Sequence, residues 1–342
     1  MTRSIAKPRM RLHLVGTVTM QPTSAVFGAL LAVAAGSSLA QSASNFPSKA
    51  VRMIVPFAAG GGTDVVARAV ASKLSEVWGQ QVLADNRPGG STIIGIDLTA
   101  KSPPDGYTIA MASTSYGINA SSGRKLPYDP HRDLAYVVQT ALQPYVITVH
   151  PALPVKTVKE FIALAKARPG ALNYGSPGVG SGSHLVVELF QIVTGTRTVL
   201  VPYKGSAPAL ADLIGGQTQF MFATILAVAP HLKSGRLKGL ATTGSKRSLA
   251  LPELPTAIEA GVTGYAPTSW TGIMAPAATP QDIRDKIQRD IVKVMATPEV
   301  RKRLEADGGE PVSGTSAEFA ALIQNEIATW TRVFKSTGIK PE

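Results

Sequence analysis

The sequence predicts an α/β protein in which two similar units form a two-lobed clamp. Residues 51–112 alternate strand, helix, strand, helix and strand, an order typical of a parallel sheet wound with helices. Residues 171–223 repeat the pattern of a strand, a Gly/Ser-rich loop and a helix. The loops follow the carboxyl ends of strands, where open α/β sheets bind their ligands.

Composition supports a globular chain with ample core. The 342 residues are 44% hydrophobic, enough for one large or two medium domains. Cysteine is absent, which excludes disulfides, thiolate catalysis, zinc–thiolate sites and an acylated N-terminal cysteine. The net charge is +12, but the basic residues are scattered without interleaved aromatics. We therefore expect mild attraction for anions and no nucleic-acid partner.

The first 45 residues resemble a secretory signal. Basic residues occur only up to Arg11, a short apolar run covers 25–35, and Ser38-Leu-Ala40 is a small-x-small cleavage site. A membrane anchor is the alternative, but the run is too short to span a bilayer comfortably. We expect a cleavable signal peptide at residues 1–40, for which Met10 would also serve as a start.

The stretch 51–78 is the centre of the first unit. Val51–Val55 reads as a buried strand, Gly60–Gly62 as a turn, and Thr63 as the N-cap of a helix that ends before Gly79. Asp64 stands in the first turn, where the helix dipole favours a carboxylate, so a structural cap is expected rather than a general base. Such a loop points several backbone N–H groups at one spot and binds anions without a basic side chain.

Further elements follow in order from periodicity and turn residues. Ser113–Tyr116 is expected as a hydroxyl-rich loop, and 136–149 as a strand pair or a long strand broken at Pro144. Thr157 and Glu160 form a capping box. The other expected strands are 81–84, 107–112, 171–174, 197–201, 219–223, 237–242 and 270–275. The other expected helices are 92–101, 158–167, 184–193, 209–214, 229–233, 281–295, 299–306 and 316–335, the last three forming a layer that returns to the first unit.

Signatures of catalysis and of nucleotide binding are missing. No dinucleotide fingerprint, phosphate loop or nucleophile elbow occurs, and the histidines lack metal spacing. We expect no metal, no cofactor and no enzyme activity. Glycine and serine are common in ordinary strand–helix connections, but several such loops in two similar units favour a clamp for a small anion.

Motifs along the whole chain after the signal resemble one family. The segments 56–64, 86–90, 104–108, 174–185, 201–213 and 270–280 are similar, in this order, to those of the Bug family, the solute receptors of tripartite tricarboxylate transporters. The resemblance implies a periplasmic, two-lobed Venus-flytrap fold with mostly parallel sheets flanked by helices. It implies lobe 1 at 46–144 plus 268–342, lobe 2 at 145–267, and a ligand cleft between them.

The same resemblance implies the function and the site. A small organic carboxylate would be held and delivered to membrane transporter subunits by a protein that we expect to be monomeric. The implied ligand contacts are Phe57, Ala58, Gly61, Gly62, Thr63, Ser113, Thr114, Ser176, Gly180, Ser181, Tyr203, Lys204 and Thr224. Family members often carry a polar or acidic residue near Ala223, and its absence disfavours an amino-acid ligand.

Two alternatives stay open. The clamp could be a sensory module that docks on a membrane signalling partner, which the sequence does not separate from transport. A hydrolase using Ser176 or Ser181 with His184 is the other, although the spacing gives no credible triad.

Overall fold

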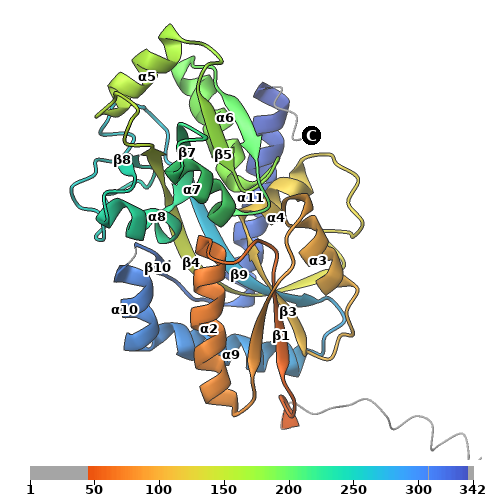
Figure 1. The fold of residues 1–342 in the computed structure, drawn as a ribbon. Coiled ribbons are helices and arrows are strands. Elements are labelled where there is room, and N and C mark those ends of the chain that lie inside the picture. Colours follow the sequence, from red (N-terminus) through yellow and green to blue (C-terminus); the bar gives the residue numbers. More distant parts are fainter. Residues whose placement is uncertain (1–44, 307, 338–342) are drawn as a thin grey trace, which may run out of the picture. The chain divides into compact units, whose positions relative to one another are not determined.

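The computed structural model describes residues 45–306 and 308–337, and these form two β-sheets that share one strand (Figure 1). The expected signal peptide, residues 1–40, lies outside the described residues. Helices cover both faces of each sheet, and this confirms the predicted α/β class.

The first sheet combines a parallel part with an antiparallel part. β1 lies between β2 and β3 and is parallel to both, as predicted. β9 is antiparallel to β3 and to β4, and β10 adds a short antiparallel pair. In order across the sheet the strands are β2 (Val82–Asn86), β1 (Val51–Val55), β3 (Thr108–Ser113), β9 (Thr268–Pro276), β4 (Leu134–Val149) and β10 (Glu310–Pro311).

Two helical layers bury the faces of the first sheet. α2 (Gly62–Trp78), α9 (Gln281–Ala296) and α10 (Pro298–Ala306) pack their apolar side chains on one face. The other face carries α3 (Ile93–Ala100), which follows the short 3-10 turn η2 (Gly90–Thr92), together with α4 (Thr114–Ser121) and α11 (Ser316–Thr337). The three C-terminal helices thus return to the first sheet, as predicted.

The second sheet repeats this plan. Its strand order is β8 (Lys238–Thr242), β4, β7 (Phe220–Thr224), β5 (Asn173–Ser176) and β6 (Val199–Pro202). β5 is parallel to β6 and β7, whereas β4 is antiparallel to its neighbours. α5 (Val158–Ala167) and α6 (Gly182–Thr194) cover one face, and α7 (Ser206–Ile214) and α8 (Ile225–Lys233) cover the other.

β4 is one continuous strand that belongs to both sheets. It pairs with β9 as far as Pro144, and from Tyr145 onward it pairs with β7 and β8. The expected break at Pro144 is therefore wrong. Pro144 occupies the point where the strand changes partners, and a residue without an N–H is tolerated at such an irregular position.

Several helices begin earlier than the sequence analysis expected. α4 starts at Thr114, inside the stretch expected as a loop, α7 starts at Ser206 and α8 starts at Ile225. Thr63 is not the N-cap of α2, because Gly61 takes that position. Small polar residues, which favour turns in isolation, begin α4 and α7, whereas α8 begins with the apolar residues Ile225 and Leu226.

Candidate functional site

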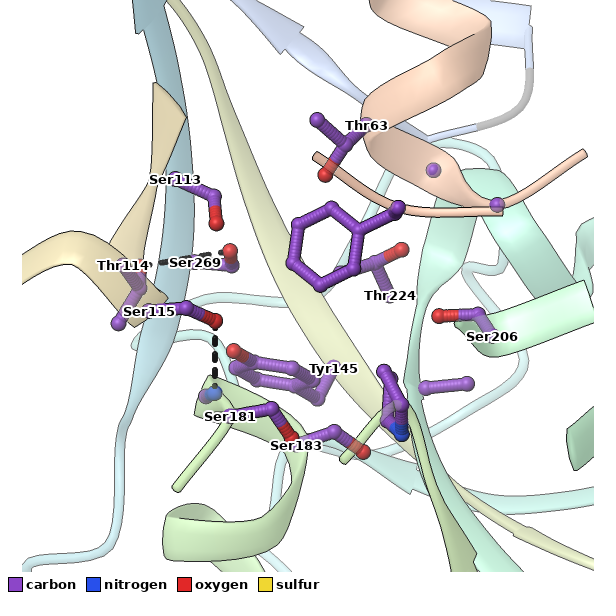
Figure 2. A pocket seen from close by; sticks show the side chains of 16 residues that line it. Thr63, Ser113, Thr114, Ser115, Tyr145, Ser181, Ser183, Ser206, Thr224 and Ser269 are labelled. Atoms are coloured by element: carbon purple, nitrogen blue, oxygen red, sulfur yellow. Dashed lines mark hydrogen bonds between the residues drawn. The ribbon is translucent and has the colours of Figure 1, made fainter. Parts of the chain in front are cut away.

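A cavity lies where loops that follow the carboxyl ends of strands in the two sheets meet. It holds about 460 Å³ of atom-free space, part of it open to solvent. Figure 2 shows its labelled hydroxyls approaching from opposite walls. This hydroxyl-lined cavity is bounded by Phe57, Gly61, Gly62, Thr63, Ser113, Thr114, Ser115, Tyr145, Pro177, Ser181, Gly182, Ser183, Ser206, Ala223, Thr224 and Ser269.

Helix N-termini converge on the hydroxyl-lined cavity. Among the described residues, five helices have their first residue or their N-cap in its wall: α2, α4, α6, α7 and α8. In four of them, all except α6, no side chain caps the first turn. Each N-terminus carries a partial positive charge and unsatisfied N–H groups. The cavity is therefore electropositive although none of its lining residues is charged.

Two hydroxyls of the cavity wall have no partner within the fold. Ser113 Oγ and Thr224 Oγ1 are buried without a hydrogen bond to any described group. Ser113 is the N-cap residue of α4 and Thr224 that of α8, yet neither side chain caps its helix. A buried hydroxyl without a partner is unfavourable, so these two donors are free to serve a ligand.

The glycine loop before α2 is held in place by Asp64. This carboxylate is 2% exposed and accepts hydrogen bonds from Gly60 N (2.8 Å), Arg68 Nε (2.9 Å) and Asn86 Nδ2 (2.8 Å). Burial would raise the pKa of Asp64, but these bonds outweigh it and lower the pKa below its ordinary value. Asp64 is thus an ionised structural anchor, as the sequence analysis expected, and it does not line the cavity.

Contacts join the two sides of the cavity. Ala58 N donates to Lys204 O (3.1 Å), and Gly182 N donates to Ser115 Oγ (3.3 Å). A Cβ atom on Gly62 would lie 2.2 Å from Thr224 Oγ1, so only glycine permits this approach. The described conformation is closed around the cavity.

The structure brings most of the predicted contacts together. Eight of them line the hydroxyl-lined cavity: Phe57, Gly61, Gly62, Thr63, Ser113, Thr114, Ser181 and Thr224.

The other five predicted contacts lie elsewhere. Ser176 is fully buried and bonds Ser181 Oγ (2.9 Å), while Gly180 N donates to His184 Nδ1 (3.0 Å). Ala58 makes the backbone contact to Lys204, whose side chain lines a neighbouring cavity together with Tyr203.

Eight lining residues were not predicted: Ser115, Tyr145, Pro177, Gly182, Ser183, Ser206, Ala223 and Ser269. Four of these, Ser115, Gly182, Ser183 and Ser206, lie in the first turn of a helix, where treating every residue of that turn as a candidate would have found them. Pro177 lies in the Gly/Ser-rich loop before α6. Tyr145 and Ser269 lie on β4 and β9, and no local signal marks them because the antiparallel pairing of these strands brings them to the cavity.

The geometry does not assemble a serine–histidine pair. His184 Nδ1 accepts from Gly180 N, and His184 Nε2 lies 3.8 Å from Glu188 Oε1. Ser181 Oγ instead interacts with Ser176 Oγ and with the backbone N of His184. Burial lowers the pKa of His184 to about 4.

The described part of the chain holds neither a metal-binding cluster nor a membrane-spanning helix. Residues 45–306 and 308–337 contain no group of three or more His, Cys, Asp or Glu side chains suited to a metal ion. In the same residues no helix combines the length and the apolar character needed to cross a bilayer.

Comparisons with known proteins agree on one family. The family model described as "Tripartite tricarboxylate transporter family receptor" matches residues 66–339. Protein BugT of Bordetella pertussis is 37% identical over 318 residues, which are 92% of this chain and 97% of BugT.

Two solved structures extend the similarity to the fold. The periplasmic binding protein BugD is similar with a TM-score of 0.84 and 29% identity, over 87% of this chain and 100% of that chain. The protein Rpa4515 of R. palustris, solved with adipate, has a TM-score of 0.85 and 37% identity, again over 87% of this chain and 100% of that chain.

Proposed function

Because this chain belongs to the family of tripartite tricarboxylate transporter receptors, which includes the Bug proteins, we propose that it captures a small organic carboxylate and delivers it to a membrane transporter of that type. Its fold is the two-lobed α/β fold of the periplasmic binding proteins, as the sequence predicted.

The observation that carries this proposal is the convergence of five helix N-termini on one cavity without charged side chains. A carboxylate there would accept charge-assisted hydrogen bonds from backbone N–H groups and from hydroxyls such as those of Ser113 and Thr224. An ammonium group would find no carboxylate in the wall, which supports an anion without an amino group. The similar protein Rpa4515 was solved with adipate, a small carboxylate.

We propose that the protein captures its ligand by closing its two lobes around it. The lobes, 46–144 plus 268–342 and 145–267, would open by bending at β4 and close on the ligand through contacts such as Ala58 with Lys204. The receptor would act in the periplasm as a monomer, after export and removal of residues 1–40. The ligand would be bound and released unchanged, because no serine–histidine pair is assembled.

Calorimetry tests the capture step. Purified protein is titrated with dicarboxylates, aromatic acids and tricarboxylates, and with the amide of each acid as a neutral control. One or a few acids should bind, and their amides should bind far more weakly because charge-assisted bonds are lost. Binding of neutral sugars or amides in preference to every acid would exclude the proposal.

A cellular experiment tests delivery. Uptake of the radiolabelled ligand should fall when this gene is deleted and return when it is restored. Unchanged uptake, with loss of a transcriptional response to the same ligand, would favour the sensory role instead.

A further inference from the structure

A second cavity adjoins the hydroxyl-lined cavity. It holds about 740 Å³ of atom-free space and shares Phe57 and Pro177 with the first cavity as common walls. We call it the annex; Ser91, Arg124, Gly178 and Lys204 are the lining residues that matter below. The two cavities are therefore neighbours that meet at these two residues.

Two polar atoms of the annex are buried without a partner among the described groups. Ser91 is 8% exposed and its Oγ makes no hydrogen bond. Arg124 Nη1 is likewise buried and unbonded. A guanidinium N–H that is withdrawn from water without an acceptor is costly, so these two donors mark the place of a missing acceptor.

The Ser91 hydroxyl is placed by a constrained backbone. Ser91 and Thr92 have φ values of 52° and 86°, in a region that residues with side chains rarely adopt. Asn119 holds this turn, since its Nδ2 donates to Ser91 O (2.8 Å) and lies 3.4 Å from Thr92 Oγ1. A Cβ atom on Gly178 would lie 3.7 Å from Ser91 Oγ, so this glycine keeps the space beside the hydroxyl open.

The charge of the annex has one sign. Arg124 and Lys204 are its charged lining residues, and no acidic side chain lines it. Among the described residues, no carboxylate forms an ion pair with Arg124. The planar fork of an arginine suits a carboxylate, which accepts two parallel N–H bonds.

We infer that the annex receives the second carboxylate of a dicarboxylate ligand, whose first carboxylate occupies the hydroxyl-lined cavity. Arg124 and Ser91 bind the distal group, and Phe57 and Pro177 pack against the connecting carbon chain. This inference rests on the proposed function and deepens it, because it names the ligand class and the residue that selects it.

The test compares ligands that have two carboxylates with ligands that have one. Glutarate, adipate and pimelate are each compared by calorimetry with the monocarboxylate of the same carbon count: pentanoate, hexanoate and heptanoate. Wild-type protein should bind at least one dicarboxylate about tenfold or more tightly than its monocarboxylate, as expected for an added charge-assisted contact. Arg124→Gln should reduce that ratio to near one by weakening only the dicarboxylate.

Two further variants complete the design. Ser91→Ala should partly reduce the ratio of dicarboxylate to monocarboxylate affinity. This variant still tests the inference if Arg124→Gln fails to fold. Lys125→Gln removes an adjacent, exposed positive charge and should leave the ratio unchanged. Thermal unfolding without ligand checks that each variant is folded.

The outcomes distinguish this inference from the proposed function. Equal wild-type affinity for mono- and dicarboxylates, or an unchanged ratio in both Arg124→Gln and Ser91→Ala, would overturn the inference and leave carboxylate capture intact. Equal weakening of both ligand classes by Arg124→Gln would also overturn it, because Arg124 would then act on closure. Absence of binding to every acid would overturn both.

Discussion

The backbone N of Ala58 donates a hydrogen bond to the carbonyl O of Lys204, 3.1 Å away, and this bond joins the glycine loop before α2 to the loop before α7. The two loops approach the hydroxyl-lined cavity from opposite sides, although neither Ala58 nor Lys204 lines it. This contact between the two loops is made by main-chain atoms alone. Glycines close to this contact determine how closely the two sides of the cavity can approach each other.

Gly62→Ala should weaken ligand binding with little effect on the unliganded fold. The added methyl would lie 2.2 Å from Thr224 Oγ1 and 2.6 Å from Gln143 Oε1, so the closed state must strain. Overpacking of roughly 1–3 kcal/mol corresponds to a loss of about 5- to 150-fold in affinity, measured by calorimetry. Gly61→Ala is the matched comparison, because its methyl would make an ordinary 3.4 Å contact with Ser206 Cβ. Equal losses in the two variants would contradict this account.

Ser113→Ala and Thr224→Val should each weaken ligand binding without lowering the stability of the unliganded protein. Each removes a hydroxyl that has no partner in the fold, so the melting temperature without ligand should stay or rise slightly. Each should also lose a bond to the bound anion, roughly tenfold in Kd if that bond contributes about 1.5 kcal/mol.

Ser183→Ala provides the control for these two variants. Its hydroxyl donates to Phe222 O, so removing it should lower the melting temperature. If Ser113→Ala and Thr224→Val destabilise the unliganded protein as much as Ser183→Ala does, their hydroxyls are structural.

Asp64→Asn should destabilise the protein at neutral pH. The pKa of Asp64 is lowered in the folded state, so its contribution to the free energy of unfolding is present above the unfolded pKa near 3.8 and is lost as pH falls through the folded value. The variant should lose roughly 1–3 kcal/mol at pH 7, as expected for charge-assisted bonds to a carboxylate. Urea unfolding at pH 7 and pH 3 should show the difference shrinking at the lower pH. A difference that does not depend on pH would assign the loss to packing alone.

Glu326→Gln should change the pH dependence of stability in the opposite sense. Burial raises the pKa of Glu326 to about 8, although Trp270 Nε1 donates to its Oε2 (2.9 Å). Between about pH 4.5, the ordinary value, and about 8, the unfolded chain releases a proton that the folded protein keeps, so the free energy of unfolding falls as pH rises. The variant should lack this fall, roughly 1.4 kcal/mol per pH unit at most.

Thermal unfolding from pH 5 to 8 measures the effect of Glu326. Glu318→Gln on the same helix is the control, since the pKa of Glu318 is lowered, first of all by the backbone N–H of Thr315. It should leave the slope in this range unchanged. A wild-type profile that is flat between pH 5 and 8 would show that Glu326 is ionised in the folded protein.

The sequence predicted the helices and strands well because the residues that begin and end them are distinctive. β-branched strands, glycine stops such as Gly79 and the capping box at Thr157 fix local structure through short-range sterics and hydrogen bonds. Helix starts were placed too late at Thr114 and Ser206, because residues of low helix propensity read as loop until packing holds them in the first turn. The start of α8 at Ile225 was missed because this helix follows β7 directly, with no turn residue between them.

The candidate site was predictable where it coincides with those loops. Phe57 and Thr63 follow from the first motif, and Ser181 follows from the Gly/Ser loop of the second unit. Tyr145 and Ser269 could not be predicted, because they reach the cavity through long-range strand pairing. That Gly180 would face His184 and not the cavity is likewise set by tertiary packing.

The shared strand β4 also limits how this receptor can be dissected. A cut at Pro144 would separate β9 from both of its partners, β3 and the Leu134–Pro144 part of β4. Either fragment would expose a long unpaired edge, a template for aggregation. The two halves are therefore obligate folding partners, and neither can be exchanged between receptors as a free-standing module.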